Sequence, residues 1–321
     1  MSEGRKQISN VLFIGLGENM KSKLLMLALC FAALTVIIVP QSCFAEKLAN
    51  TIDELVEMYD DSKCWECHSD QHDEWKTSYH SDPINSSLGG IRNFIMVGLA
   101  KEWNTPLTKA QILKCLDCHA PVVNFASEKL AVQIAEMIVT AKDKAGTPEA
   151  DAVKKELAKL NVGCTACHNI KATATAQGLR GKAVHGKIYG VSGDDNDEHG
   201  VVEAVELKRS IFCMQCHGIY SAPDGEKIQC NTLSGSYQDA YSNLGGSETC
   251  QDCHMKDNKH NFPGGHNKEI VAEGLGLDVQ ITPYRHLPGK IKTAKNQKAW
   301  VPSAVVTAFV ENKSGHRIPD G

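Results

Sequence analysis

Five short motifs with the pattern Cys-x-x-Cys-His supply the residues best suited to chemistry in this chain. Their members are Cys64, Cys67 and His68; Cys115, Cys118 and His119; Cys164, Cys167 and His168; Cys213, Cys216 and His217; and Cys250, Cys253 and His254. With this spacing two sulfurs can bond to the two vinyl groups of one porphyrin, and the imidazole that follows can bind its iron. The sequence therefore predicts five covalently bound haems c as cofactors, each with a proximal histidine.

Two other chemistries use paired cysteines. A structural zinc site takes two Cys-x-x-Cys pairs, so an odd number of pairs fits poorly, and zinc does not require histidine at one fixed offset. A thioredoxin-like dithiol occurs once per domain, beside a βαβ unit. Both alternatives account for the repeated motif less well than haem does.

Each iron also needs a ligand on its far side. Eight histidines lie outside the motifs: His72, His80, His185, His199, His260, His266, His286 and His316. They suffice to give every iron a second imidazole, and such ligation favours lower reduction potentials than methionine–histidine ligation. His72 follows His68 by one helical turn, so it could serve only a different haem. The pattern predicts a low-potential electron carrier.

The N-terminus has the features of a secretory signal, residues 1–45. Lys21 and Lys23 precede an apolar run over residues 24–39, and small residues lead to a predicted cleavage site after Ala45. Met20 is an alternative start, and a retained anchor is an alternative to cleavage. Because c-type haem is attached on the oxidising, non-cytoplasmic side, we expect a periplasmic or extracellular protein.

The charge of the chain argues against a nucleic-acid partner. The formal net charge is −4, and haem propionates would make it more negative, whereas a nucleic-acid partner requires a basic surface. No nucleic-acid partner is expected.

Outside the signal and the motifs, Cys230 is the one cysteine left, and we expect it to be buried as a small apolar residue.

The segments between the motifs predict a mostly α-helical fold with long irregular loops, wound around the haems. Helices are expected over residues 52–59, 105–115, 128–145, 148–160 and 201–212, from capping residues and helical periodicity. Residues 172–197 are expected to form a long loop, and no strand is expected before residue 270. Residues 46–275 form the predicted pentahaem domain. Residues 276–321, with a β-rich run at 301–310, are expected to begin a longer β-rich region.

Several motifs carry a family resemblance. The run Cys64–His68 with Trp75, Ser78 and His80 resembles the opening motif of the multihaem cytochromes c related to hydroxylamine oxidoreductase and the nitrifier tetrahaem cytochrome. Similar matches are Gly163–His168, Lys187–Gly190 with His199, Cys253–Met255, His260–His266 and Ser314–Gly321. The resemblance covers most of residues 60–321.

This resemblance implies closely packed haems whose distal histidines come from loops belonging to other motifs. On that basis the expected distal ligands are His80, His185, His199, His260 and His266, with His316 in reserve. His286 has no supporting context and is expected at the surface.

The resemblance leaves two function classes. In an electron carrier every iron is six-coordinate, and electrons pass from a membrane quinol oxidoreductase or a small cytochrome to a terminal reductase or an extracellular acceptor. In a reductase or oxidase of small nitrogen or sulfur compounds, one iron stays open. Pentahaem nitrite reductases attach the active haem through a motif ending in lysine, whereas all five motifs here end in histidine. Hydroxylamine-oxidising relatives carry more haems and a cross-linked tyrosine, which nothing identifies here. The carrier is favoured.

Overall fold

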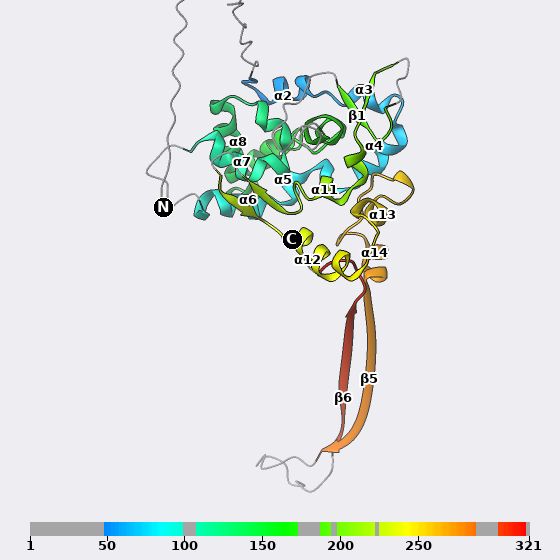
Figure 1. Ribbon diagram of the computed structural model, residues 1–321. Helices are drawn as coiled ribbons and strands as arrows, with labels where there is room; N and C mark the ends of the chain where they lie inside the picture. Colours follow the sequence, from blue (N-terminus) through cyan, green and yellow to red (C-terminus); the bar gives the residue numbers. More distant parts are fainter. Residues whose placement is uncertain are drawn as a thin grey trace, which may run out of the picture. The chain divides into compact units, whose positions relative to one another are not determined.

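The computed structural model describes residues 48–98, 107–172, 187–193, 198–221, 225–286 and 301–318 (Figure 1). By its backbone contacts the chain divides into Met1–Glu46 and Lys47–Gly321, and the described residues all belong to the second unit. The expected signal, residues 1–45, and the expected ligand His185 lie outside the described residues.

Helices dominate the first half of the described chain, as the sequence predicts. In order they are α2 (Ile52–Met58), α3 (Ser62–Trp65), α4 (Ser69–Lys76), η1 (Tyr79–Ser81), α5 (Pro83–Ser86), α6 (Leu88–Asn93), η2 (Phe94–Gly98), α7 (Lys109–His119), η4 (Pro121–Phe125), α8 (Glu128–Asp143), α9 (Pro148–Leu157) and η5 (Ala166–Lys171). None of the helices that the structure describes is both long and apolar enough to cross a bilayer.

Helix α8 forms the centre of the apolar core. The hydroxyl of Ser127 caps its first turn by accepting from the Leu130 amide, and Leu130, Ile134 and Ile138 form one buried stripe. This stripe packs within a single cluster that includes residues of α2, α6 and α7. The predicted helix over 128–145 is confirmed, and α2 and α9 confirm the predictions over 52–59 and 148–160.

Helix α7 carries the second motif at its C-terminal end. Thr108 and Gln111 form a capping box at its start, so the helix begins three residues after the predicted Thr105. Thr105 and Pro106 lie outside the described residues. Ile112, Leu113 and Leu116 are buried on its core face. The core therefore holds this motif in place.

The second half is less regular. It contains β1 (Ile188–Gly190), β2 (Val201–Glu203), η6 (Val205–Lys208), α11 (Ser210–Cys213), β3 (Ile219–Ser221), β4 (Lys227–Gln229), α12 (Leu233–Ala240), η7 (Ser242–Leu244), α13 (Cys250–His254), η8 (Lys256–Asn258) and α14 (Lys268–Gly274). Strands β1 and β2 pair in parallel, and β3 and β4 pair antiparallel.

These short strands correct two expectations. The prediction of no strand before residue 270 is wrong, and the helix predicted over 201–212 is replaced by β2, η6 and α11. Tertiary packing overrides the local helical preference of this segment. Tyr189 of β1 is buried against Ala172 and Ala204, which aligns β1 with the β-branched residues of β2.

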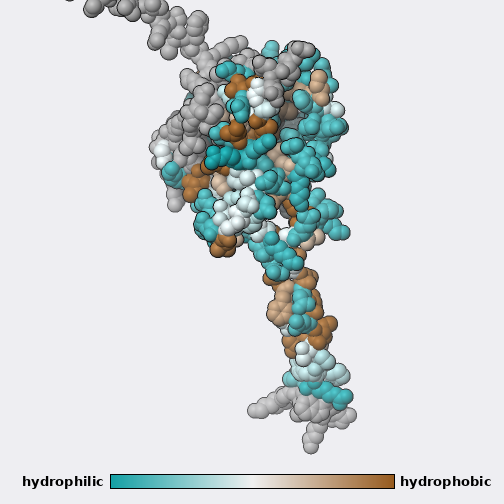
Figure 2. Space-filling model, turned by 45° about the vertical axis from the view of Figure 1, so that its right-hand side comes forward, coloured by the Kyte–Doolittle hydropathy of each residue, from teal (hydrophilic) through white to brown (hydrophobic). Residues whose placement is uncertain are grey.

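The C-terminal described segment is a β-hairpin of β5 (Leu275–His286) and β6 (Val301–Asn312). The β-rich run at 301–310 is confirmed as β6, and its antiparallel partner β5 pairs with it along the whole strand. One face is entirely apolar over its central part. It carries Leu277, Val279, Ile281 and Pro283 opposite Val310, Ala308, Val306 and Ala304, and Figure 2 shows apolar residues gathered along the hairpin.

Candidate haem-binding site

The five motifs lie on single helical turns or at helix ends. The first motif begins in α3, the second lies at the end of α7, and the third enters η5. The fourth begins at the last residue of α11, and the fifth forms α13. In the first and fourth, the histidine amide donates to the carbonyl of the first cysteine, at 2.8 Å for His68 and 2.9 Å for His217. One turn places the two sulfurs and the imidazole close together, as attachment to one porphyrin requires.

Motifs distant in sequence lie beside one another. The thiols of Cys64 and Cys164, of Cys118 and Cys216, and of Cys213 and Cys250 interact with each other. The sulfur of Cys167 also interacts electrostatically with that of Cys216. The first motif therefore lies beside the third, the third beside the fourth, and the fourth beside both the second and the fifth.

Three motif histidines each face a histidine from elsewhere in the chain. The ring centres are 6.2 Å apart for His80 and His217, 6.4 Å for His168 and His260, and 6.2 Å for His254 and His316. With a metal–nitrogen bond of about 2.0 Å and about 1.1 Å from that nitrogen to the ring centre, the ring centres of two imidazoles on opposite sides of one iron lie about 6.2 Å apart. The spacing equals that of two imidazoles on one iron.

Backbone carbonyls orient four of these six imidazoles. The Nδ1 atom of His168 lies 2.8 Å from the Tyr189 carbonyl oxygen, and that of His260 lies 2.9 Å from the Asn258 carbonyl oxygen. The corresponding distances are 2.6 Å from His254 to Pro263 and 2.8 Å from His316 to Arg317. Because a carbonyl only accepts, each Nδ1 must donate, which leaves the Nε2 lone pair for a metal. In the His168–His260 pair and in the His254–His316 pair, both rings therefore have Nε2 available to bind iron.

The loop around His260 is held in an unusual conformation. Among the described residues other than glycine, positive φ angles occur at Asp257 (59°), Asn258 (60°) and Phe262 (42°), and these positions flank His260. The His260 amide donates to Glu74 of α4 at 2.8 Å. Strained backbone tends to persist where function requires it, and here it sets the direction of His260.

His80 lies in η1, in a densely packed environment. Burial, followed by the nearby imidazoles of His217, His119 and His266, lowers the pKa of His80 to about 4. At neutral pH the ring is therefore uncharged, which is the form that binds iron. Its backbone is fixed as well, because the His80 carbonyl accepts from the Val162 amide at 3.0 Å.

The remaining histidines lie in different surroundings. His266 is exposed and stacks on Tyr79 with ring centres 4.3 Å apart, and His72 lies between Trp65 and Trp75. His199 is partly buried after β1, and His286 is exposed at the end of β5, as expected. Among the described residues, His119 interacts electrostatically with His80 and His217, and His68 with His260, but neither His68 nor His119 belongs to one of the three pairs.

The geometry does not support zinc. In the described ranges one cluster of potential ligands is found, Asp61, Cys64 and Cys164, with ligand atoms within 4.8 Å of one another. It takes one cysteine from each of two motifs and excludes Cys67 and Cys167, whereas a zinc site built from two pairs would use all four.

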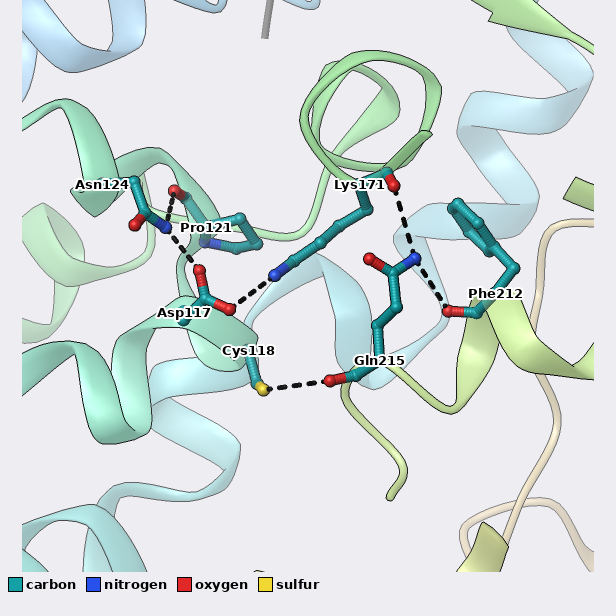
Figure 3. Close-up of polar contacts among 7 residues, drawn as sticks. All are labelled: Asp117, Cys118, Pro121, Asn124, Lys171, Phe212 and Gln215. Atoms are coloured by element: carbon teal, nitrogen blue, oxygen red, sulfur yellow. Dashed lines mark hydrogen bonds and ion pairs between the residues drawn. The ribbon is translucent and has the colours of Figure 1, made fainter. Parts of the chain in front are cut away.

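A buried ion pair connects three motifs (Figure 3). Lys171, three residues after His168, donates to Asp117 of the second motif at 2.7 Å. The other carboxylate oxygen of Asp117 accepts from Asn124 at 2.6 Å. Gln215 of the fourth motif donates to the Lys171 carbonyl at 3.3 Å.

Cys230 differs from the sequence expectation. It is exposed directly after β4, so the prediction that it is buried is wrong. The preceding Ile228 turns inward and is buried, and the strand's alternation places Gln229 outward before the chain turns at Cys230.

Comparison with known proteins agrees with this site. Residues 63–169, which contain the first three motifs, match the family model described as Cytochrome c554 and c-prime. No curated protein and no solved structure matches the chain. The match supports a c-type cytochrome with covalently bound haem that acts in electron transfer.

Proposed function

We propose that this chain is an exported pentahaem c-type cytochrome of the hydroxylamine-oxidoreductase-related superfamily, and that it carries electrons through closely packed, mainly bis-histidine haems. The observation that carries the proposal is the three facing imidazole pairs, each of which contains the histidine of a Cys-x-x-Cys-His motif. A six-coordinate iron has no position for a substrate and is suited to moving single electrons.

The pairs suggest specific ligands. We assign His80 to the iron of His217, His260 to that of His168, and His316 to that of His254. His316 thus takes the place expected for His266, because its ring faces a motif histidine and its Nδ1 is already oriented. For the irons of His68 and His119, His185 and His199 remain the predicted partners.

The contacts between motifs support a continuous path for electrons. When bound, the haems would supply the one-electron redox chemistry, and the protein would fix their order and spacing. The proposed donors are a membrane quinol oxidoreductase or a small cytochrome, and the proposed acceptors a terminal reductase or an extracellular oxidant. The proposed compartment is the periplasm or the cell exterior, which is consistent with the signal-like N-terminus and the haem motifs.

Haem counting and spin state test the proposal together. Full-length protein, made with a c-type haem maturation system, should give five haems per chain by pyridine haemochrome analysis, one for each motif. Its electron paramagnetic resonance spectrum should be dominated by low-spin, bis-imidazole signals. Three haems or fewer, or bound zinc, would refute it.

One observation favours a second function. Because neither His68 nor His119 belongs to the three facing pairs, the first and second haems are the candidates for an iron with an open position. Such an iron could bind nitrite or hydroxylamine, as in a reductase or oxidase. A high-spin signal that shifts on adding either compound would establish this alternative if it is lost in one of two variants, Cys64→Ser/Cys67→Ser or Cys115→Ser/Cys118→Ser.

A further inference from the structure

Lys171 and Asp117 form a buried ion pair among the haem motifs. Their side chains are only 10% and 15% exposed, and their charged atoms lie 2.7 Å apart. By contrast, the pair Lys144–Glu149 is 52% and 56% exposed. Charges shielded from water act on their neighbours far more strongly than charges at the surface.

The pair lies where the second and fourth motifs meet. Asp117 stands between Cys115 and Cys118, and the Cys118 sulfur interacts with that of Cys216. The Lys171 ammonium interacts electrostatically with both of these sulfurs. Figure 3 shows Lys171 reaching toward Asp117, with Cys118 and Gln215 nearby.

The pair is held from both sides, so the position of the charges is fixed. Asn124 donates to Asp117 at 2.6 Å and to the Pro121 carbonyl at 3.0 Å. Gln215 donates to the carbonyls of Lys171 and Phe212 at 3.3 and 3.1 Å. The Asp117 carboxylate, 2.7 Å from the Lys171 ammonium, stabilises the charged form of the lysine.

We propose that Lys171 raises the reduction potentials of the haems attached at the second and fourth motifs, and that Asp117 limits this rise. The inference rests on the proposed function, because it requires haems at Cys115/Cys118 and Cys213/Cys216. Reduction adds a negative charge to a haem, so a fixed cation nearby favours the reduced state and a fixed anion disfavours it. The balance of the two charges would tune one step of the electron path.

Redox titration of the full holoprotein, followed by its optical spectrum, tests this proposal. Lys171→Met should shift one or two of the five midpoint potentials downward, and the isosteric Asp117→Asn should shift the same potentials upward. The double variant should lie between the single variants, and Lys171→Arg, which keeps the charge, should remain near the wild type. Lys144→Met removes an exposed partner and should shift none.

Haem counts and spin states of each variant separate the possible failures. Five low-spin haems with unshifted potentials in both single variants would overturn the role of the pair and leave the proposed function intact. Fewer than four haems in the wild type would overturn the proposed function itself. If the Lys171→Met protein cannot be produced, the Asp117→Asn variant alone tests the proposal. Midpoint potentials that stay unchanged or shift downward in Asp117→Asn would reject it.

Discussion

At the residue scale, the site depends on which nitrogen of each imidazole is free. Carbonyls bind Nδ1 in His168, His254, His260 and His316, so all four rings present Nε2. The proximal residues follow from the motif alone, because their spacing is dictated by the porphyrin. Of the far-side partners, His80 and His260 were expected from the family resemblance and keep this role in the proposal, whereas His316 was not among the five expected. His316 follows a long hairpin and reaches His254 only through the fold, so it could only be a reserve candidate.

The assignment of His316 yields a prediction. Replacing His316 with alanine removes one proposed axial ligand and should convert one of the five haems from low spin to high spin. Electron paramagnetic resonance of the purified holoprotein measures this conversion. His266→Ala is the matched control, since His266 stacks on Tyr79 and should leave the spectrum unchanged. The reverse pattern would return the role to His266.

At the element scale, local and non-local structure were predictable to different degrees. Helices α8 and α9 have their own caps, at Ser127 and Thr147, and a clear buried stripe or proline start, so sequence alone located them. Strand β5 and the short strands β1 to β4 were not predicted, because a strand is stabilised by a partner that can lie far along the chain. The helix predicted over 201–212 was wrong for the same reason.

Helix α8 offers a test of the core. Ile138 is fully buried at its centre, and Ile138→Ala should lower the free energy of unfolding by about 2–5 kcal/mol through lost burial and a cavity. Urea denaturation of the holoprotein, followed by far-ultraviolet circular dichroism, measures the change. Glu136→Ala, at an exposed position of the same helix, should change it by less than about 0.5 kcal/mol. Equal effects would mean that α8 does not pack as described.

At the scale of the whole molecule, the apolar face of the hairpin is the main feature that neither the motifs nor the core accounts for. Leu277, Ile281 and Val310 are 70%, 65% and 69% exposed on it. A two-stranded hairpin is marginally stable alone, and a long apolar strand pair at the surface promotes association. Its reverse face is mixed, because the polar residues Asp278, Gln280 and Thr307 share it with Val305 and Phe309.

We expect this face to drive concentration-dependent self-association. Sedimentation velocity of the holoprotein should show a species larger than a monomer, and Ile281→Lys should raise its dissociation constant at least about tenfold by burying an unpaired charge. Thr307→Lys, on the reverse face and opposite the polar Gln280, is the control and should have little effect. A wild-type protein that stays monomeric at the highest soluble concentration would contradict this expectation.

The sulfur contacts between motifs finally bear on how the protein is made. Cys118 and Cys216, and likewise Cys64 and Cys164, are within hydrogen-bonding reach in the folded chain. In an oxidising compartment, free thiols held so near each other are prone to cross-link into disulfides. A chain that folded too early would consume the groups its porphyrins need. The nearness of these thiols therefore favours attachment of haem to an open polypeptide, before the interior closes around it.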